Sequence, residues 1–400
     1  MKIAVIGLGY VGLNVALTAS NHYEVIGYDN DETKISKLLR GQSYIEGISN
    51  ENLNKGLALR SFLPTAKTEL LSLADVYVIC VPTPLDSDRK PDLKYLNSAI
   101  ELIAKFAVRK SLIINESTSY PGTLRNLIAR QIKDKNIFNH LYAVSPERVD
   151  PGNLEWDIIN TPRILSGLDE ESITKAFEFY SVFANDIRIV ETPEIAETAK
   201  LFENTFRQVN IALVNELAII CDALSINVWE VINAASTKPY GFMKFKPGSG
   251  VGGHCIPVDP TYLAYSAEQK GVRARFIELA NQVNFNMPKY VLDRCEEMVG
   301  KLDKKKILIA GVSYKPNISD VRESPAELMY EDARERGAMV SWHDPLVENW
   351  QSNRVDKLGQ EMFDLAIIQV RHDAMDIEAI KASAKVVFDC TGTVAGVNSL

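Results

Sequence analysis

Cys255 stands in a loop whose composition favours contact with a ligand. Residues 248–259 read GSGVGGHCIPVD, and prolines flank them on both sides. Glycine-rich backbone packs poorly in a core but brings N–H groups close to a bound molecule. A nucleophilic thiol is therefore the favoured interpretation of Cys255. The alternatives are a buried inert thiol and a zinc ligand, although zinc needs three or four ligands and His254 is the only neighbouring one.

Two polar side chains in the long apolar segment before this loop could assist a thiol. Lys200 and Asn204 are four residues apart, which places them on one face of a helix. A nearby ammonium lowers the pKa of a thiol and stabilises an alkoxide, and Asp259 could orient water or hold a proton. A solvated helix face is the alternative for the helical pair. Together these groups suit oxidation of an aldehyde through a thiohemiacetal and a thioester to an acid.

The N-terminus carries a dinucleotide-binding pattern. The sequence GLGYVG, residues 7–12, follows the apolar run KIAVI and precedes a helical pattern. Its glycines allow a tight turn, close approach to a pyrophosphate and close helix packing, with the helix N-terminus facing the phosphates. Asp29 ends the next apolar run, where a carboxylate binds ribose hydroxyls and repels a 2′-phosphate. The pattern favours NAD over NADP; a glycine turn needed only for packing is the alternative.

Polar residues also follow three further apolar runs. Thr83 lies in VPTP, Ser117 and Thr118 lie in NEST, and Glu147 and Arg148 lie in SPER. Ligands of open parallel sheets bind beyond the carboxyl ends of the strands, so these residues are candidates for the same crevice. Ordinary loop polarity is the alternative for each of them.

The elements that must position these residues follow a regular rhythm. Short β-branched runs alternate with helical patterns up to residue 191, and a long helix is predicted from Thr192, as N-cap, through residue 224. Four strand-like runs return after Gly300, and the first three each precede a helix-like segment. The pattern predicts an α/β protein in which residues 1–192 and 299–400 form two doubly wound parallel-sheet domains. Residues 193–298 form a helical domain between them.

The overall composition limits the class of protein. The chain has 400 residues, 46% hydrophobic, and a net charge of −8, which argues against broad binding to nucleic acid or anionic membranes. Its scattered cysteines have no CxxC spacing, so no metal site or disulfide framework is expected. A reducing cytoplasm fits this cysteine usage best. We find neither a signal peptide nor a run long enough to cross a membrane.

The motifs occur in an order that identifies a resemblance. GLGYVG, VPTP, EST.YPGT, SPER.DPGN, ETAKLFENTFR, GVGGHCIPVDP and YKPNISDVRESP resemble those of the nucleotide-sugar 6-dehydrogenases, the family of UDP-glucose dehydrogenase. The resemblance spans essentially the whole chain. It implies an NAD-binding Rossmann domain, a helical dimerisation domain, and a C-terminal Rossmann-like domain that binds the nucleotide of a UDP-sugar.

The resemblance also implies roles for individual residues. Cys255 would be the nucleophile, Lys200 and Asn204 would stabilise oxyanions, and Asp259 would position Lys200 and the hydrolytic water. Thr118 and Glu147 would assist proton transfers through water. NAD contacts are implied for Gly7, Gly9, Tyr10, Val11, Gly12, Asp29, Thr83, Thr118 and Arg322. Substrate contacts are implied for Glu147, Arg148, Lys200, Asn204, Arg207, Gly252, Lys315 and Arg275, the last reaching the neighbouring subunit of a homodimer.

Two motifs bear on the sugar. UDP-glucose dehydrogenases usually have a lysine where this chain has Val258, and SPEF where it has SPER. The loop GGHCIPVDP resembles the branch that acts on UDP-N-acetylhexosamines, and Arg148 and Arg207 are candidates for contacts near the sugar. The resemblance favours UDP-N-acetylglucosamine, with UDP-N-acetylmannosamine, UDP-N-acetylgalactosamine and UDP-glucose as alternatives.

The predicted reaction is the two-step oxidation of the sugar C6 hydroxyl to a carboxylate, with two NAD reduced per sugar. A one-step β-hydroxyacid dehydrogenase also joins a Rossmann domain to a helical one, but it has no use for the Cys255 loop. A non-catalytic nucleotide-sugar sensor is the alternative from another class, and the presence of Cys255, Lys200, Asn204 and Asp259 together argues against it.

Overall fold

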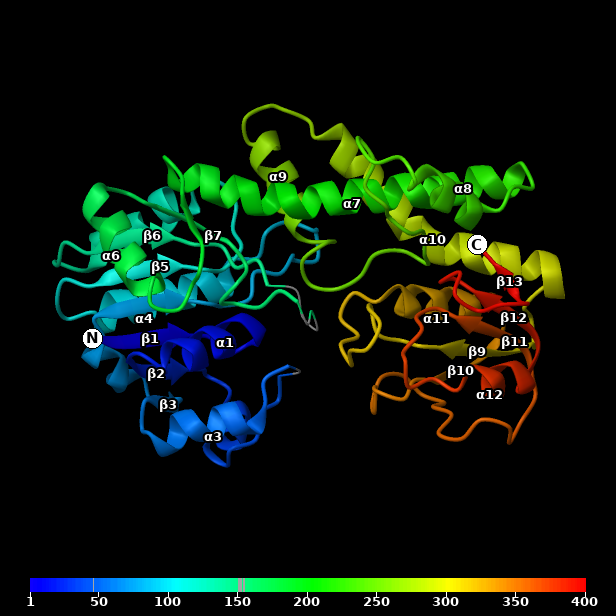
Figure 1. Ribbon diagram of the computed structural model, residues 1–400, viewed down its shortest axis with the longest axis horizontal. Coiled ribbons are helices and arrows are strands. Elements are labelled where there is room, and N and C mark those ends of the chain that lie inside the picture. Colours follow the sequence, from blue (N-terminus) through cyan, green and yellow to red (C-terminus); the bar gives the residue numbers. More distant parts are fainter. Residues whose placement is uncertain (46, 150–152, 154) are drawn as a thin grey trace. The chain divides into compact units, whose positions relative to one another are not determined.

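The computed structural model describes residues 1–400 except 46, 150–152 and 154. The chain divides into two compact units (Figure 1). We call residues Met1–Glu203 with Thr261–Gly271 the N-terminal unit, and Asn204–Pro260 with Val272–Leu400 the C-terminal unit. The residues Asp150–Gly152 of the SPER.DPGN motif lie outside the described part of the chain.

The N-terminal unit is built on an 8-stranded sheet in the order β3-β2-β1-β4-β5-β6-β7-β8. Its strands are β1 (Lys2–Ile6), β2 (Glu24–Tyr28), β3 (Phe62–Thr65), β4 (Val76–Ile79), β5 (Leu112–Asn115), β6 (Leu141–Val144), β7 (Arg163–Gly167) and β8 (Ile187–Ile189). The chain reverses direction of travel across the sheet between β1 and β4. Ligands of such sheets bind at this switch point, beyond the carboxyl ends of the strands.

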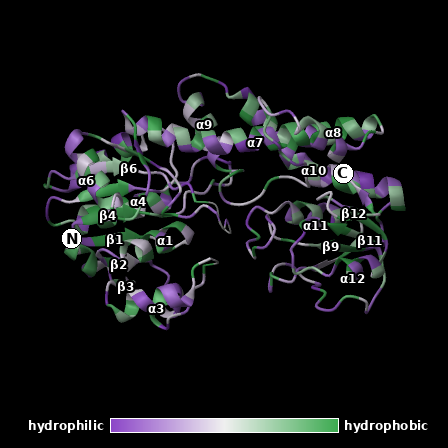
Figure 2. Cartoon of the chain, in the orientation of Figure 1, coloured by the Kyte–Doolittle hydropathy of each residue, from purple (hydrophilic) through white to green (hydrophobic). Residues whose placement is uncertain are grey.

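Helices cover both faces of this sheet. They are α1 (Tyr10–Ala19), α2 (Glu32–Leu39), α3 (Asn50–Ala58), α4 (Lys94–Phe106), α5 (Arg130–Lys135) and α6 (Glu170–Tyr180), with a 3₁₀ turn at Thr68–Leu73 and a π-helical turn at Leu124–Ala129. Alternate residues of β1 enter opposite cores: Ile3 and Val5 pack with α1 and α6, whereas Ala4 and Ile6 pack with α4. The strands are accordingly hydrophobic along their length (Figure 2).

Two features of this sheet differ from the sequence expectation. Strand β3 was not among the predicted apolar runs; it has only 4 residues, Phe62–Thr65, and one of them is a proline. The pair β6–β7 is antiparallel, whereas a fully parallel sheet was expected. The described residues between these two strands form no crossover helix, and an antiparallel pair needs none.

The long helix is confirmed. Helix α7 spans Pro193–Ala223, with Pro193 at its first position as the sequence predicts. The helical segment continues with α8 (Val228–Ala235), α9 (Asp259–Glu268) and α10 (Arg275–Val299). Within the C-terminal unit, Asn215 of α7 donates to the side chain of Asn284 on α10 at 2.9 Å, both buried. None of the helices in the described part of the chain is long and apolar enough to cross a membrane.

The C-terminal unit contains a second parallel sheet of 5 strands in the order β10-β9-β11-β12-β13. Its elements are β9 (Lys306–Ala310), α11 (Pro325–Glu335), β10 (Met339–His343), β11 (Phe363–Ile368), α12 (Ile377–Ala382), β12 (Ala384–Asp389) and β13 (Asn398–Ser399). Ile307 and Ile309 pack towards α10 and α11, and Leu308 and Ala310 pack towards α12. The predicted α/β class, with two Rossmann-like sheets and a central helical segment, is confirmed.

One expectation for this sheet is wrong. A helix-like segment was expected after β10, but residues 344–362 are all described and form turns and bends. Asp344 accepts hydrogen bonds from the N–H groups of Leu346 and Val347 immediately after the strand. These side chain–backbone bonds compete with helical ones and favour a turn.

Candidate active site

The glycine loop after β1 has the geometry of a dinucleotide cradle. Gly7 has a φ of +92°, and a Cβ there would stand 2.6 Å from the carbonyl oxygen of Cys80. A Cβ on Gly12 would stand 1.8 Å from the carbonyl oxygen of Gly7. Gly9 is the N-cap of α1, whose first residues are Tyr10 and Val11. The helix N-terminus therefore approaches the sheet edge closely and leaves backbone N–H groups for phosphate oxygens.

Asp29 lies at the end of β2, where its carboxylate is fixed by the backbone. Its Oδ2 accepts from the Leu8 N–H at 2.9 Å, its Oδ1 accepts from the Asp31 N–H at 3.0 Å, and Lys34 Nζ lies 3.4 Å away. A carboxylate held between the first two strands of the sheet fits the ribose of NAD. The residues of this cradle thus fit the predicted cofactor.

Hydrogen bonds connect the segments that follow β4 and β5, beside this cradle. The Val81 N–H donates to Ser117 Oγ at 2.9 Å, and the Ser117 hydroxyl donates to the Val81 carbonyl at 2.9 Å. Thr83 is buried, and Thr118 is partly exposed. The predicted strand-end residues therefore lie along one edge of the sheet, as the topology requires.

Glu147 is surrounded by positive charge and hydrogen-bond donors. Its Oε2 accepts from Arg163 Nη2 at 2.7 Å, and its Oε1 accepts from the N–H groups of Arg148 and Val149 at 2.7 and 2.9 Å. Burial acts to raise the pKa of Glu147, but Arg163, these backbone donors and the Lys200 charge lower it below its usual value. Glu147 is therefore held as a carboxylate within electrostatic reach of Lys200.

A second carboxylate shares the same arginine. Glu116 Oε1 lies 3.4 Å from Arg163 Nη1 and accepts from the Tyr180 hydroxyl at 2.5 Å, and Arg163 also lies over the Tyr180 ring. Burial raises the pKa of Glu116 to about 7; the Arg163 charge opposes this rise and the Glu147 charge adds to it. One buried cation therefore serves two buried carboxylates, one held ionised and one that titrates near neutral pH.

Helix α7 carries Lys200 and is anchored to the loop that carries Thr118. Glu197, one turn before Lys200, is 1% exposed and accepts from the N–H groups of Gly122 and Leu124 at 2.6 and 2.9 Å. Burial raises the pKa of Glu197 to about 8, although the two N–H donors oppose it. This carboxylate sets the position of α7 relative to the end of β5.

Arg148 is engaged by neighbouring groups of the N-terminal unit. Its guanidinium contacts both carboxylate oxygens of Glu203 at 2.7 and 3.1 Å and donates to the Pro162 carbonyl at 2.7 Å. Arg148 and Glu203 line a cavity of about 340 Å³ together with Asn153, Trp156, Thr161 and Pro162. A bidentate arginine with a fixed guanidinium is suited to orient a polar ligand group.

In the C-terminal unit, the predicted nucleophile lies directly before α9. Cys255 is exposed, whereas the other four cysteines are buried. The Cys255 carbonyl accepts from the Asp259 N–H at 2.8 Å, and the Asp259 carboxylate accepts from Asn204 Nδ2 at 2.5 Å. The structure thus brings together three residues that the sequence placed in one site: Cys255, Asp259 and Asn204.

The glycines before Cys255 pack against the YKPNISDVRESP segment. A Cβ on Gly252 would stand 2.6 Å from the Glu323 carbonyl oxygen, and one on Gly253 would stand 2.7 Å from the Tyr314 ring. The Gly253 N–H donates to the Arg322 carbonyl at 3.0 Å. We expected these glycines to bring the backbone close to a ligand. They are also required because two segments of the C-terminal unit pack closely here.

Arg322 lies beside the nucleophile loop. Hydrogen bonds to Asp320 raise the pKa of Arg322, burial opposes the rise, and the negative charges of Asp320 and of the ionised form of Cys255 add to it. Of the other predicted substrate residues, Lys315 follows β9 at the carboxyl edge of the second sheet, and Arg207 and Arg275 are exposed on α7 and at the start of α10. Within the described part of the chain, no group of three or more metal-ligating side chains is close enough to hold an ion.

Sequence reasoning missed Glu116, Arg163 and Tyr180. Arg163 opens the apolar strand β7, and Glu116 follows β5 inside the NEST motif. A charged residue at the edge of a buried strand indicates that an oppositely charged partner lies nearby, because burying an unpaired charge costs free energy. The sequence does not indicate which residue is that partner; only the fold does.

Family models match most of the chain in three consecutive parts. Residues 1–184 match the NAD binding domain of the UDP-glucose/GDP-mannose dehydrogenase family, residues 194–286 match its central domain, and residues 308–395 match its UDP binding domain. The chain belongs to the UDP-glucose/GDP-mannose dehydrogenase family. This dehydrogenase is an NAD-dependent oxidoreductase that acts on a UDP-sugar. The predicted resemblance, enzyme class and cofactor are confirmed.

Comparison with individual relatives indicates which branch of the family this chain is similar to. The UDP-N-acetyl-D-mannosamine dehydrogenase of Methanocaldococcus jannaschii is 38% identical over 93% of this dehydrogenase and 86% of its own length. An NDP-N-acetyl-D-galactosaminuronic acid dehydrogenase of Ralstonia solanacearum is 37% identical over 81% and 78%. The solved UDP-D-ManNAc dehydrogenase of Pyrococcus horikoshii has a TM-score of 0.91 at 33% identity, covering 100% of this chain and 98% of its own. These relatives lie in the branch named for N-acetylated sugars.

Proposed function

We propose that this dehydrogenase oxidises the C6 hydroxyl of a UDP-N-acetylhexosamine to a carboxylate. The observation that carries the proposal is the arrangement at Cys255. This cysteine is exposed, its backbone carbonyl accepts a hydrogen bond from the Asp259 N–H, and the Asp259 carboxylate accepts a hydrogen bond from the Asn204 side chain. A primary alcohol becomes an acid only by losing two hydrides. A cysteine makes the second loss possible, because it converts the aldehyde into a thiohemiacetal.

The chain's own residues support each step in this proposal. NAD, when bound, supplies the hydride acceptor and is used twice per sugar. The Cys255 thiolate forms a C–S bond to the C6 aldehyde, and the resulting oxyanion takes a proton. Loss of the second hydride leaves a thioester, and water then breaks the C–S bond to give the carboxylate and the free thiol. The overall change consumes one water and releases three protons.

Charged groups in each unit are suited to these steps. We assign oxyanion stabilisation to the ammonium of Lys200 and the amide of Asn204. Asp259 would orient the hydrolytic water, because its carboxylate is buried and fixed by Asn204. Glu147 stays ionised beside Lys200 and would act through water together with Thr118, stabilising the Lys200 ammonium.

The test is the number of NADH formed per UDP-sugar consumed. Wild type is expected to give two, with the uronic acid as product. Cys255→Ser is expected to give no acid, because an alcohol does not replace the thiol as acceptor of the aldehyde. Cys221→Ala is the matched control, since Cys221 is buried in α7 and has no assigned role. Acid formation by Cys255→Ser at the wild-type rate would remove the thiol from the mechanism.

The relatives' names bear on the sugar. The UDP-N-acetyl-D-mannosamine dehydrogenases support UDP-N-acetylmannosamine as the first substrate to test. UDP-N-acetylglucosamine, which the sequence resemblance favoured, stays a prediction. We propose that Arg148 and the cavity that it lines with Glu203 receive the acetamido group. Comparing kcat/KM for UDP-N-acetylated mannosamine, glucosamine and galactosamine and for UDP-glucose decides among them; equal values with UDP-glucose would contradict an acetamido site.

We also propose a homodimer formed through α7. Large apolar side chains recur along one stripe of this helix and are exposed, namely Phe206, Leu213 and Ile220, at 42, 60 and 49%. Phe276, 79% exposed, follows Arg275 at the start of α10, which supports Arg275 as a residue lent to the partner's site. Light scattering after size exclusion tests this: Leu213→Glu is expected to give a monomer, and a monomeric wild type would refute the dimer.

A further inference from the structure

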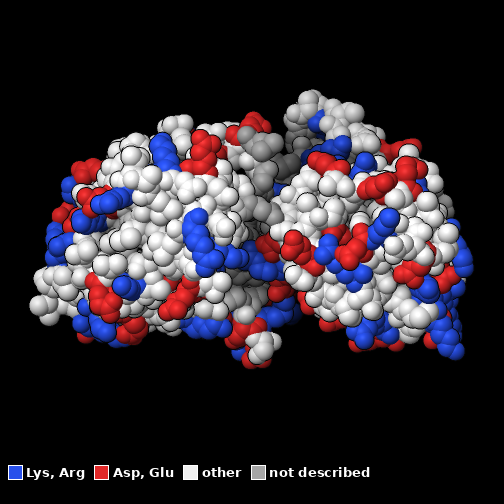
Figure 3. Space-filling view, turned by 90° about the horizontal axis from the view of Figure 1, so that it is seen from below, with Lys and Arg blue, Asp and Glu red and all other residues white. Residues whose placement is uncertain are grey.

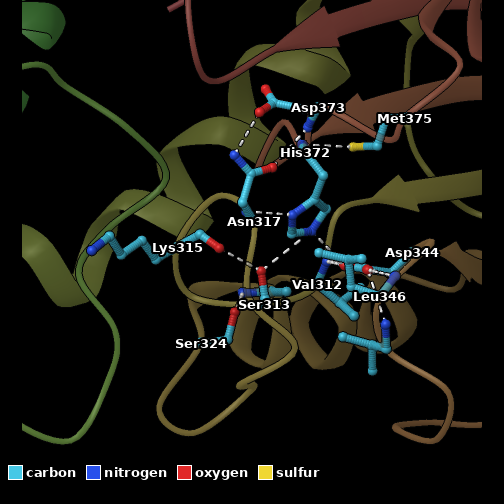
Figure 4. Close-up of polar contacts among 12 residues, drawn as sticks. Val312, Ser313, Lys315, Asn317, Ser324, Asp344, Leu346, His372, Asp373 and Met375 are labelled. Atoms are coloured by element: carbon cyan, nitrogen blue, oxygen red, sulfur yellow. Dashed lines mark hydrogen bonds and ion pairs between the residues drawn. The ribbon is translucent and has the colours of Figure 1, made fainter. Parts of the chain in front are cut away.

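A buried polar cluster lies where β9, β10 and β11 end (Figure 4). Its members are Ser313, Asp344 and His372, each at most 1% exposed. They lie in the segments that follow three different strands of the second sheet. Because buried polar groups are costly unless they are hydrogen-bonded, a cluster in this position needs an account of its partners.

The hydrogen bonds assign the proton on His372. The Asn317 N–H donates to Nδ1 at 2.8 Å, so this nitrogen carries no proton. Nε2 lies 3.0 Å from Asp344 Oδ2, and it therefore donates to the carboxylate. Asp344 also accepts from the N–H groups of Val312 and Leu346 at 2.8 Å. His372 is thus a neutral imidazole that connects the turn after β9 to the end of β10.

Asn317 is held from a second side by Asp373. The Asn317 amide donates to Asp373 Oδ2 at 2.9 Å, and the Asp373 N–H donates to Asn317 Oδ1 at 2.8 Å. Asn317 has a φ of +62°, in the left-handed region that asparagine tolerates better than most residues. Three hydrogen bonds from two consecutive residues therefore fix this point of the turn.

Lys315 lies inside the turn that these bonds hold. Its carbonyl accepts from the Ser313 hydroxyl at 2.8 Å, and Ser313 Oγ lies 3.3 Å from His372 Nε2. In Figure 4 the Lys315 side chain extends away from His372. Its backbone is thus fixed from the interior, while its ammonium points to the other side of the turn. When the backbone of a binding turn is already fixed, less conformational entropy is lost on ligand binding.

We propose that His372, through Asp344 and Asn317, is a positioning residue that presets the Ser313–Asn317 turn so that Lys315 binds the diphosphate of the nucleotide. This proposal rests on the UDP-sugar substrate and on the predicted role of Lys315. His372 itself is buried and acts through the turn. Its loss is expected to weaken nucleotide binding and leave the chemical steps unchanged.

Calorimetric titration of the full chain with UDP, and separately with NADH, tests the proposal. His372→Phe keeps a ring but offers no hydrogen bond, and it is expected to weaken UDP binding about 10- to 100-fold. His372→Gln supplies one acceptor and one donor and is expected to recover most of this loss. His343→Gln is the matched control, because His343 lies on β10 and bonds the Val355 carbonyl away from the turn.

The kinetic expectation separates positioning from general damage. For His372→Phe, KM for the UDP-sugar is expected to rise by the same factor as the UDP dissociation constant, while kcat and NADH affinity change less than about threefold. Unchanged UDP affinity in a folded His372→Phe overturns the proposal. So does a loss of NADH affinity equal to the loss of UDP affinity.

Two further variants complete the test. Lys315→Ala is expected to weaken UDP binding; if it does not, the assigned role of Lys315 fails, whatever His372 does. If His372→Phe does not fold, Asn317→Gly replaces it, because glycine keeps the positive φ and the N–H and loses only the bonds to Asp373. Asn317→Gly is expected to weaken UDP binding about 3- to 10-fold, and wild-type affinity in this variant overturns the proposal.

Discussion

Replacing Glu116 by glutamine should change how the stability of the N-terminal unit depends on pH. The carboxylate is 1% exposed and shares Arg163 with Glu147. Glutamine imitates the protonated acid: its carbonyl can still accept from the Tyr180 hydroxyl, which lies 2.5 Å from Oε1 in the wild type. Since Oε2 has no hydrogen-bond partner, the amide nitrogen replaces an atom that is already unsatisfied.

The size of the effect follows from the pKa of Glu116. Burial raises it from 4.5 to about 7, so the folded state binds this proton more tightly than the unfolded state. The resulting stabilisation is complete below pH 4.5 and is lost as pH rises through about 7. By linkage, the wild type should lose roughly 2 to 3 kcal/mol of stability between pH 5 and pH 8. Glu116→Gln lacks the titration and should lack this loss.

Differential scanning calorimetry at pH 5, 6, 7 and 8 measures the effect. The unfolding transition of the N-terminal unit is recognised as the one whose Tm rises when NADH is added, because a ligand stabilises the state that binds it. The Tm difference between Glu116→Gln and wild type should shift in favour of the variant by about 5 to 10 °C from pH 5 to pH 8. A difference that stays constant over this range, or shifts in favour of wild type, refutes the account of the shared arginine.

Glu147→Gln is the matched control on the same arginine. Arg163 and the backbone donors hold the pKa of Glu147 below its usual value, so its stabilisation is present above that value and is lost only in acid. Glu147→Gln should therefore be less stable than wild type from pH 6 to pH 8. Because the Glu147 charge also raises the pKa of Glu116, this deficit should narrow over the range, by less than the shift expected for Glu116→Gln. The two carboxylates of one cluster should thus give different pH dependences.

Three further outcomes are expected. Gly12→Ala should weaken NADH binding at least 100-fold in a fluorescence titration and leave UDP binding intact, because its Cβ would stand 1.8 Å from the Gly7 carbonyl oxygen; tight NADH binding would contradict the cradle. Glu197→Gln should lower Tm at pH 5 by losing one backbone bond, and the deficit should narrow as pH rises through about 8, where the wild-type carboxylate ionises; a deficit that widens would contradict this. Iodoacetamide should label Cys255 first in peptide mass spectrometry, since the other four cysteines are buried; earlier labelling elsewhere would contradict its assigned exposure.

Local features of the sequence predicted most of the architecture. The rhythm of apolar runs indicated both parallel sheets, and Thr192–Pro193 marked the start of α7 at the correct residue. The glycine spacing predicted the NAD cradle, because a tight turn and a close approach need glycine at fixed positions. The helix expected after β10 and the fully parallel first sheet were wrong. In both places the outcome depended on how a connecting segment satisfies its backbone, which apolar periodicity does not describe.

The candidate site shows the same division. The sequence by itself supplied the candidates for the chemistry, Cys255, Asp259, Asn204 and Lys200, because the types and local spacing of these residues suit a nucleophile and its helpers. Only the tertiary structure decided the supporting contacts: Arg163 between two carboxylates, and His372 between Asp344 and Asn317. These partners are separated by 16 to 55 residues along the chain. Their hydrogen bonds exist only where folded strands end side by side, and no spacing rule along the sequence encodes that proximity.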